Sequence, residues 1–91
     1  MARVEITFKI MPEGPATDLN KISVAVKKEI EVFGGVVRQH VIEPIGFGIQ
    51  AIMITFIMDE SKGATDPLEE KIARIPEVNS VEVSHVTRAF G

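Results

Sequence analysis

The amino-acid sequence predicts an α+β fold in which two helices lie on one face of a four-stranded antiparallel sheet. Its 91 residues suit a single small domain that spans residues 1–91. Apolar residues alternate with a period of two in some segments, as in strands, and recur every three or four positions in others, as in helices. Along the chain these patterns predict the order strand, helix, strand, strand, helix, strand.

The first strand is predicted over Arg3 to Ile10, where apolar and polar residues alternate without a break. Such alternation is typical of a strand with one covered face. The segment Met11 to Pro15 follows, and its two prolines and one glycine are expected to end the strand. The residues of the covered face are Val4, Ile6, Phe8 and Ile10.

A helix is predicted after this break, because apolar residues follow one another at spacings of three and four. Thr17 or Asp18 can cap its first turn, and Gly34 and Gly35 are expected to end it. The charged residues between the apolar ones are typical of a solvated face. The apolar stripe consists of Leu19, Ile22, Val26, Ile30 and Phe33.

Two strands are predicted next, over Val36 to Ile42 and over Ile49 to Met58, with Glu43 to Gly48 as their connection. The strand from Ile49 is apolar at nearly every position, which is typical of a central strand. One alternating half of it must face away from the helices. Such an apolar face is either an interface or is covered by long side chains such as Lys9 and Arg3. The two alternating halves are Ala51, Met53, Thr55 and Ile57, and Ile52, Ile54, Phe56 and Met58.

The second helix is predicted to begin at Asp66, which can act as the N-cap, with Pro67 at the first helical position and Glu69 in the first turn. Pro76 is expected to end it, and the last strand is predicted over Val78 to Val86. The resulting βαββαβ order is that of the ferredoxin-like sandwich. In that arrangement two right-handed crossovers place both helices on one face, and the first and third strands are central.

The composition argues against catalysis, nucleic-acid binding and membrane insertion. The net charge is −3, and Tyr, Trp and Cys are absent, so there is no broad basic surface, few rings for base stacking and no thiolate chemistry. His40 and His85 stand apart, and the carboxylates lie on predicted helix faces and turns. The longest apolar run, Ile49 to Met58, is too short to span a bilayer, and no signal peptide is visible. We expect a soluble, cytoplasmic protein that is not an enzyme and needs no cofactor or metal.

Two segments are unusual enough to suggest contact with a partner. The first is a run in which glycines flank a phenylalanine in a predicted loop. Local physics favours a tight turn with this ring packed on the sheet edge, whereas a ring that points outward is a good anchor for a partner. The second segment, Thr87 to Gly91, places a cation and an aromatic residue after the last strand. The first run consists of Pro44, Ile45, Gly46, Phe47 and Gly48.

Three segments resemble the archaeal translation elongation factor 1-beta family of guanine-nucleotide exchange factors. They are Met11 to Glu13 after the opening strand, Glu43 to Ile49, and the closing segment Val78 to Phe90. The resemblance covers nearly the whole chain, and the Pro-Ile-Gly-Phe-Gly run is its specific part. It implies the ferredoxin-like fold predicted above. It also implies exchange of GDP for GTP on elongation factor 1-alpha, the GTPase that delivers aminoacyl-tRNA to the ribosome.

The resemblance further implies roles for individual residues. In eukaryotic relatives a loop phenylalanine inserts into the GTPase, and Phe47 matches that position. A lysine near the C-terminus of those relatives disturbs the magnesium and phosphate site, and Arg88 aligns with it, which keeps the cation but makes it planar and bulkier. No cofactor, metal or direct nucleic-acid contact is implied. The partner-binding residues expected on this basis are Pro44, Ile45, Gly46, Phe47, Gly48 and Arg88.

Two other functions suit the same fold. One is a regulatory module of the ACT type, which binds a small molecule, and the other is a structural homo-oligomer joined through the sheet. Both require self-association, whereas an exchange factor can act alone. For the exchange factor we expect a monomer when the partner is absent.

Overall fold

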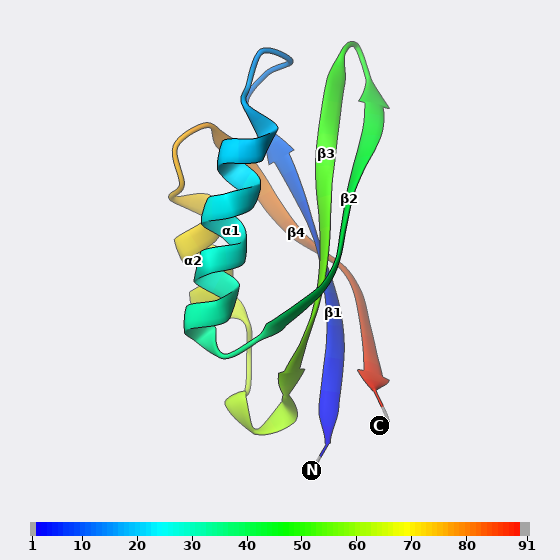
Figure 1. Cartoon of the computed structure of the whole chain (residues 1–91), viewed down its shortest axis with the longest axis vertical. Helices are drawn as coiled ribbons and strands as arrows, with labels where there is room; N and C mark the ends of the chain where they lie inside the picture. The colour runs from blue at the N-terminus through cyan, green and yellow to red at the C-terminus, as the bar shows by residue number, and fades with distance from the viewer. Residues whose placement is uncertain (1, 90–91) are drawn as a thin grey trace.

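The computed structural model describes residues 2–89, and Met1, Phe90 and Gly91 lie outside the described residues (Figure 1). The element order is βαββαβ, as predicted, with one short 3₁₀ helix between β3 and α2. The elements are β1 (Arg3–Pro12), α1 (Leu19–Phe33), β2 (Val36–Gly46), β3 (Ile49–Asp59), η1 (Glu60–Lys62), α2 (Asp66–Ala73) and β4 (Val78–Ala89).

The four strands form one antiparallel sheet in the order β2-β3-β1-β4, so β1 and β3 are central. Both helices cover the same face of this sheet (Figure 1). The prediction of a ferredoxin-like fold with two helices on one face is therefore confirmed. We call the other face the open face.

The hydrophobic core lies between the helices and the sheet. Phe8 on β1 and Phe56 on β3 meet there edge to face, with ring centroids 5.0 Å apart. Complete burial of an apolar side chain of this size contributes about 1.5–3 kcal/mol to folding. The predicted alternation of β1 and the predicted stripe of α1 both point into this core. Its largest members are Phe8, Phe56, Ile10, Ile22, Ile30, Ile52, Ile54, Leu68, Ile72 and Val26.

Two strands extend into segments that were predicted to be connections. β1 runs to Pro12, which is buried and pairs with Val78 after a register shift. β2 runs to Gly46, so the predicted connection from Glu43 is wrong, because Pro44 still lies opposite Gln50 in the ladder. Since β2 is an edge strand, proline can sit in it with no loss of a ladder hydrogen bond on its solvent side.

Side chains and a glycine define the helix ends. The carboxylate of Asp18 accepts hydrogen bonds from the backbone amides of Asn20 and Lys21, so Asp18 is the N-cap of α1. Gly34 ends α1 in the left-handed region at φ 103°. The prediction for α2 is off by one residue, because Thr65 is its N-cap and Asp66 is already helical.

Neighbouring side chains cover part of the open face, which bears on the two alternatives for β3. Ala51 and Thr55 are buried on that face, and the Thr55 hydroxyl lies 2.8 Å from the Thr7 hydroxyl in a hydrogen bond. Met53 is half-buried and lies opposite Lys9, which is itself half-buried. Flanking side chains therefore cover this face only in part, because Val36 and Val41 on β2, opposite Ile57 and Met53, stay exposed.

Gly35, which joins α1 to β2, has no room for a side chain. A Cβ added there would lie 2.8 Å from Cγ2 of Ile30 and 2.9 Å from Cδ2 of Phe56, both in the core. We expect Gly35→Ala to lower the free energy of unfolding by about 1–3 kcal/mol, because the core would have to shift. Urea unfolding measures this change. Gly14→Ala is the control, since its Cβ would meet nothing within 4 Å, and an equal loss in both variants would contradict the packing argument.

The sheet is much longer than the helices that cover it. The 15 residues of α1 span about 22 Å, whereas the 11 residues of β3 span about 36 Å. The molecule measures 42 × 21 × 17 Å, and the strands project past the helices at both ends of its long axis (Figure 1). Each projecting end carries residues that the sequence analysis singled out.

Candidate docking sites at the two ends of the sheet

The β2–β3 hairpin forms one end, which we call the tip. Only Phe47 and Gly48 connect the two strands, because Gly46 pairs with Ile49. Phe47 has φ 54° and Gly48 has φ 76°, and two positive φ values are the mark of a type I′ hairpin turn. Asn-Gly is the usual pair in such a turn, and here a phenylalanine takes the place of the asparagine.

Phe47 is both strained and fully exposed. A bulky residue in the left-handed region costs on the order of 1 kcal/mol or more. In the free protein the ring makes no packing contact that would offset this strain, because no neighbour covers it. The structure therefore contradicts the interpretation that the ring packs on the sheet edge, and it supports the outward-pointing alternative.

Other apolar groups surround Phe47 at the tip. Ile45 and Pro44 are exposed on the same hairpin. The β1–α1 loop lies close by, since a Cβ on Gly48 would be 3.5 Å from Cβ of Pro15. Gly46, at φ 134°, has a backbone conformation that only glycine adopts easily. The predicted run from Pro44 to Gly48 is thus gathered in one place, around one exposed ring.

The helix-facing side of β2 is joined to α1 by a hydrogen bond. Nε2 of His40 lies 3.0 Å from the hydroxyl of Ser23, which is buried. Burial, and secondarily the positive charge of Lys27, lowers the pKa of His40 from its ordinary value of 6.5. This contact holds the strand that leads to the tip against the body of the protein.

Acidification should weaken this contact. The pKa of His40 is lower in the folded protein than in the unfolded chain. As the pH falls below 6.5, the unfolded chain therefore binds more protons than the folded protein does. The free energy of unfolding decreases over this range, until the pH reaches the pKa of His40 in the folded protein. We expect thermal midpoints between pH 8 and pH 5.5 to fall more in the wild-type protein than in His40→Gln. Identical slopes would contradict a perturbed His40.

Arg88 lies at the other end of the sheet. It is on β4 opposite Val4, and its Nη2 donates a hydrogen bond to Oε1 of Glu60 at 2.7 Å in an exposed ion pair. Glu60 belongs to η1, whose start is fixed by Asp59. The Asp59 carboxylate accepts a hydrogen bond from the amide of Ser61 at 2.9 Å, and that bond is the main cause of a lowered pKa of Asp59.

The structure does not bring Phe47 and Arg88 together. Arg88 pairs with Val4, and Val4 pairs with Met58, so Arg88 is level with the C-terminal end of β3. Phe47 precedes Ile49, the first residue of β3. From Ile49 to Met58 a strand rises about 30 Å. The two predicted partner contacts therefore cannot touch one point on a partner, and they define two separate sites.

The end that carries Arg88 is rich in arginine, and we call it the basic end. Three of the chain's four arginines lie there, on three different strands, and Asp59 and Glu60 offset part of their charge. The sequence alone does not indicate Arg3 and Arg38 as site residues, because only the strand register brings them to the same end of the sheet. The three arginines are Arg3, Arg38 and Arg88.

No group of three or more His, Asp or Glu side chains among residues 2–89 is arranged to hold a metal ion. Within the same residues, neither helix is long and apolar enough to cross a membrane. An exposed, strained aromatic residue at one end and a cluster of cations at the other are features of a domain that docks onto another macromolecule. The two ends of the sheet are thus the candidate docking sites of a small ferredoxin-like α+β domain.

Comparison with known proteins identifies the family. Residues 5–89 match the family described as the EF-1 guanine nucleotide exchange domain. A protein named elongation factor 1-beta from Methanocella arvoryzae is 38% identical over 90 residues, which cover 99% of this chain and 100% of that protein. One of the same name from Methanocaldococcus jannaschii is 37% identical and covers 98% and 100%. The chain belongs to the EF-1 guanine nucleotide exchange domain family, which supports nucleotide exchange in translation elongation as its class of function.

Solved structures share the fold at low sequence identity. The C-terminal domain of the MgtC protein from Mycobacterium tuberculosis has a TM-score of 0.60 and 12% identity, with 98% of this chain and 88% of that chain covered. The ACT domain from GTP pyrophosphokinase of Chlorobium tepidum has a TM-score of 0.59 and 18% identity, with 87% and 95% covered. At such identities the likeness shows the fold alone, so it does not favour the ACT-type function.

Proposed function

We propose that this protein promotes the exchange of GDP for GTP on elongation factor 1-alpha, with the tip and the basic end docking on the GTPase at two separate places. The observation that carries this proposal is Phe47, a strained and fully exposed aromatic residue. It lies within the part of the chain that matches the exchange family. A protein keeps such a costly side chain in solvent only where something else gains from it.

Phe47 serves as the anchor of the complex. Its ring is fully exposed in the free protein, so burial in an apolar pocket of the GTPase contributes about 2–3 kcal/mol to binding. The turn already holds the ring in its outward position, which lowers the entropic cost of binding. Ile45 and Pro44 extend the apolar contact around it.

Arg88 acts at the nucleotide. Mg²⁺ and the phosphate-binding loop of a GTPase hold the phosphates of the nucleotide, and a guanidinium brought beside them competes with the metal for the same oxygens. The two other arginines of the basic end favour this placement, because their charge attracts an anionic surface. The Glu60 carboxylate holds Arg88 until the phosphates or carboxylates of the partner replace it.

Exchange then follows from reciprocal binding. If the bound factor weakens the affinity of the GTPase for nucleotide, nucleotide weakens the affinity of the GTPase for the factor by the same ratio. GDP leaves first, and the factor leaves when GTP binds. No covalent bond forms, so the protein needs no chemistry of its own. The proposal includes a factor that is monomeric when free and acts in the cytoplasm.

Release of a fluorescent GDP analogue from the cognate elongation factor 1-alpha tests this function. Release is followed after mixing with excess unlabelled nucleotide, with and without this protein. We expect the rate to rise with the concentration of the protein and to saturate. A rate that stays at the intrinsic value at every concentration would sink the exchange function, and light scattering would then ask whether the chain self-associates as an ACT-type module does.

A further inference from the structure

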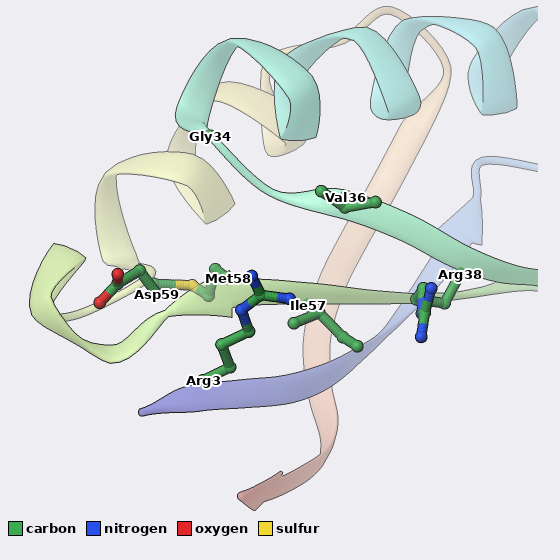
Figure 2. A pocket seen from close by; sticks show the side chains of 7 residues that line it. All are labelled: Arg3, Gly34, Val36, Arg38, Ile57, Met58 and Asp59. Atoms are coloured by element: carbon green, nitrogen blue, oxygen red, sulfur yellow. The ribbon is translucent and has the colours of Figure 1, made fainter. Parts of the chain in front are cut away.

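The open face carries a hollow at the basic end, with a volume of about 220 Å³ (Figure 2). Arg3 from the start of β1 and Arg38 from β2 contribute its cations. The side chains of Val36 and Ile57, from neighbouring strands, lie between these two arginines (Figure 2). The hollow therefore has an apolar floor with a guanidinium on either side.

These two guanidiniums have no carboxylate partner within residues 2–89, where the one ion pair joins Arg88 to Glu60. Asp59 lines the hollow beside Met58, but its carboxylate accepts the hydrogen bond from the Ser61 amide. Asp59 lies opposite Arg3 in the β1–β3 ladder, so its negative charge offsets that arginine more than Arg38. An anion in the hollow is thus expected to depend most on Arg38.

We propose that this hollow binds an acidic side chain of the GTPase, as a contact separate from those of Phe47 and Arg88; this inference rests on the proposed exchange function. Two planar guanidiniums suit a carboxylate, which can accept paired hydrogen bonds from either of them. The apolar floor of Val36 and Ile57 suits the methylene groups of a Glu or Asp side chain.

A protein carboxylate fits the hollow better than a nucleic-acid phosphate does. A phosphate backbone carries no apolar group for the floor to cover, and nucleic-acid binding depends on a broad basic surface. This chain has a net charge of −3, and the exposed ring of Phe47 lies at the opposite end of the sheet. The register also places Arg3 opposite Ala89, so the hollow lies at the same end of the sheet as Arg88, which pairs with Val4 and therefore points to the other face.

Binding to nucleotide-free elongation factor 1-alpha tests the inference. We expect Arg38→Gln to raise the dissociation constant about tenfold and to reduce its dependence on salt, because a charged contact is lost. Arg38→Lys, which keeps the charge but not the paired hydrogen bonds, should fall between. Asp59→Asn should tighten binding, because it removes a competing charge and can still accept from Ser61. Lys28→Gln on the exposed face of α1 is the control for net charge.

A second measurement needs no GTPase. The arginine Nε–Hε signals of the isolated protein are followed by NMR during titration with N-acetylglutamate and, separately, with inorganic phosphate. With N-acetylglutamate, we expect the signals of Arg3 and Arg38 to shift more than that of Arg74, the C-cap residue of α2. We also expect Arg38→Gln to suppress the shift of the Arg3 signal. A larger response to phosphate would overturn the assignment to a carboxylate.

The outcomes separate this inference from the exchange function. If the wild-type protein accelerates GDP release but Arg38→Gln binds as tightly as Lys28→Gln, the hollow is not a contact and the exchange function stands. If the wild-type protein neither binds nor accelerates release, the exchange function fails, and with it the acidic side chain of that GTPase as the occupant. The NMR titration then still shows whether the hollow binds a carboxylate at all, and no shift would overturn the site itself.

Discussion

Replacing Phe47 with asparagine is expected to abolish most nucleotide exchange and, at the same time, to make the free protein more stable. Asparagine tolerates the left-handed conformation at this turn position, and Asn-Gly is the preferred pair of a type I′ hairpin. Relief of strain should raise the free energy of unfolding by about 1 kcal/mol. Loss of the ring should remove about 2–3 kcal/mol of binding, which corresponds to a 30- to 150-fold weaker complex.

The two effects are measured separately, by urea unfolding of the free protein and by titration of GDP release. Val24→Asn is the matched control, because Val24 is also an exposed apolar residue, at 69%, but lies on α1. We expect it to leave exchange unchanged. If Phe47→Asn stabilised the protein and kept full exchange activity, the strain at the tip would have no role in docking. A gain in stability together with a loss of exchange is the pattern that a role in structure alone cannot produce.

Replacing Arg88 with alanine is expected to lower the maximal rate of GDP release about 10- to 150-fold, while the complex still forms through Phe47. A hydrogen bond between a guanidinium and a phosphate or carboxylate contributes about 1.5–3 kcal/mol, and that contribution would act on the nucleotide site. Arg88→Lys should recover much of the rate, because it restores the positive charge. The exchange rate at saturating protein concentration is the quantity to compare.

The ion pair with Glu60 provides the control for this result. Glu60→Gln breaks the pair but leaves Arg88 charged, and an exposed pair of this kind adds little to stability. We therefore expect Glu60→Gln to keep or exceed the wild-type rate. Equal losses in Arg88→Ala and Glu60→Gln would mean that the ion pair matters for the shape of this end, and that Arg88 does not act at the nucleotide.

Periodicity predicted the fold well because burial imposes it. The alternation around Phe8 and the stripe around Val26 both follow from a core that lies on one side of each element. Strand ends are harder to predict, because proline and glycine can either end a strand or lie within it. Pro12 and Pro44 both lie in the ladder, each beside a register shift that absorbs the irregularity. Local sequence does not say whether a strand is at an edge, and only edge position makes Pro44 acceptable.

The candidate site was predictable in part. The run around Phe47 stood out in the sequence, but its outward direction depends on a two-residue turn that becomes visible only once Gly46 is paired with Ile49. The hollow was not predictable from one sequence. Arg3 and Arg38 are 35 positions apart, and they share it because β1 and β2 both pair with β3. Their position in the same hollow depends on the register between the strands, which a local sequence pattern does not determine.

The unbroken course of β3 has a mechanical consequence. This strand begins directly after the tip and ends directly before η1, and it is hydrogen-bonded to a neighbour on each side. The separation between the two ends is therefore set by backbone geometry and does not change when side chains move. The sheet is thus a rigid spacer that fixes the distance between the tip and the basic end. The two sites on the GTPase can lie on parts that move relative to each other. The protein then binds only the GTPase conformation in which the spacing of these sites matches the length of the sheet. The affinity of the GTPase for nucleotide is lowered to the extent that this conformation binds nucleotide more weakly.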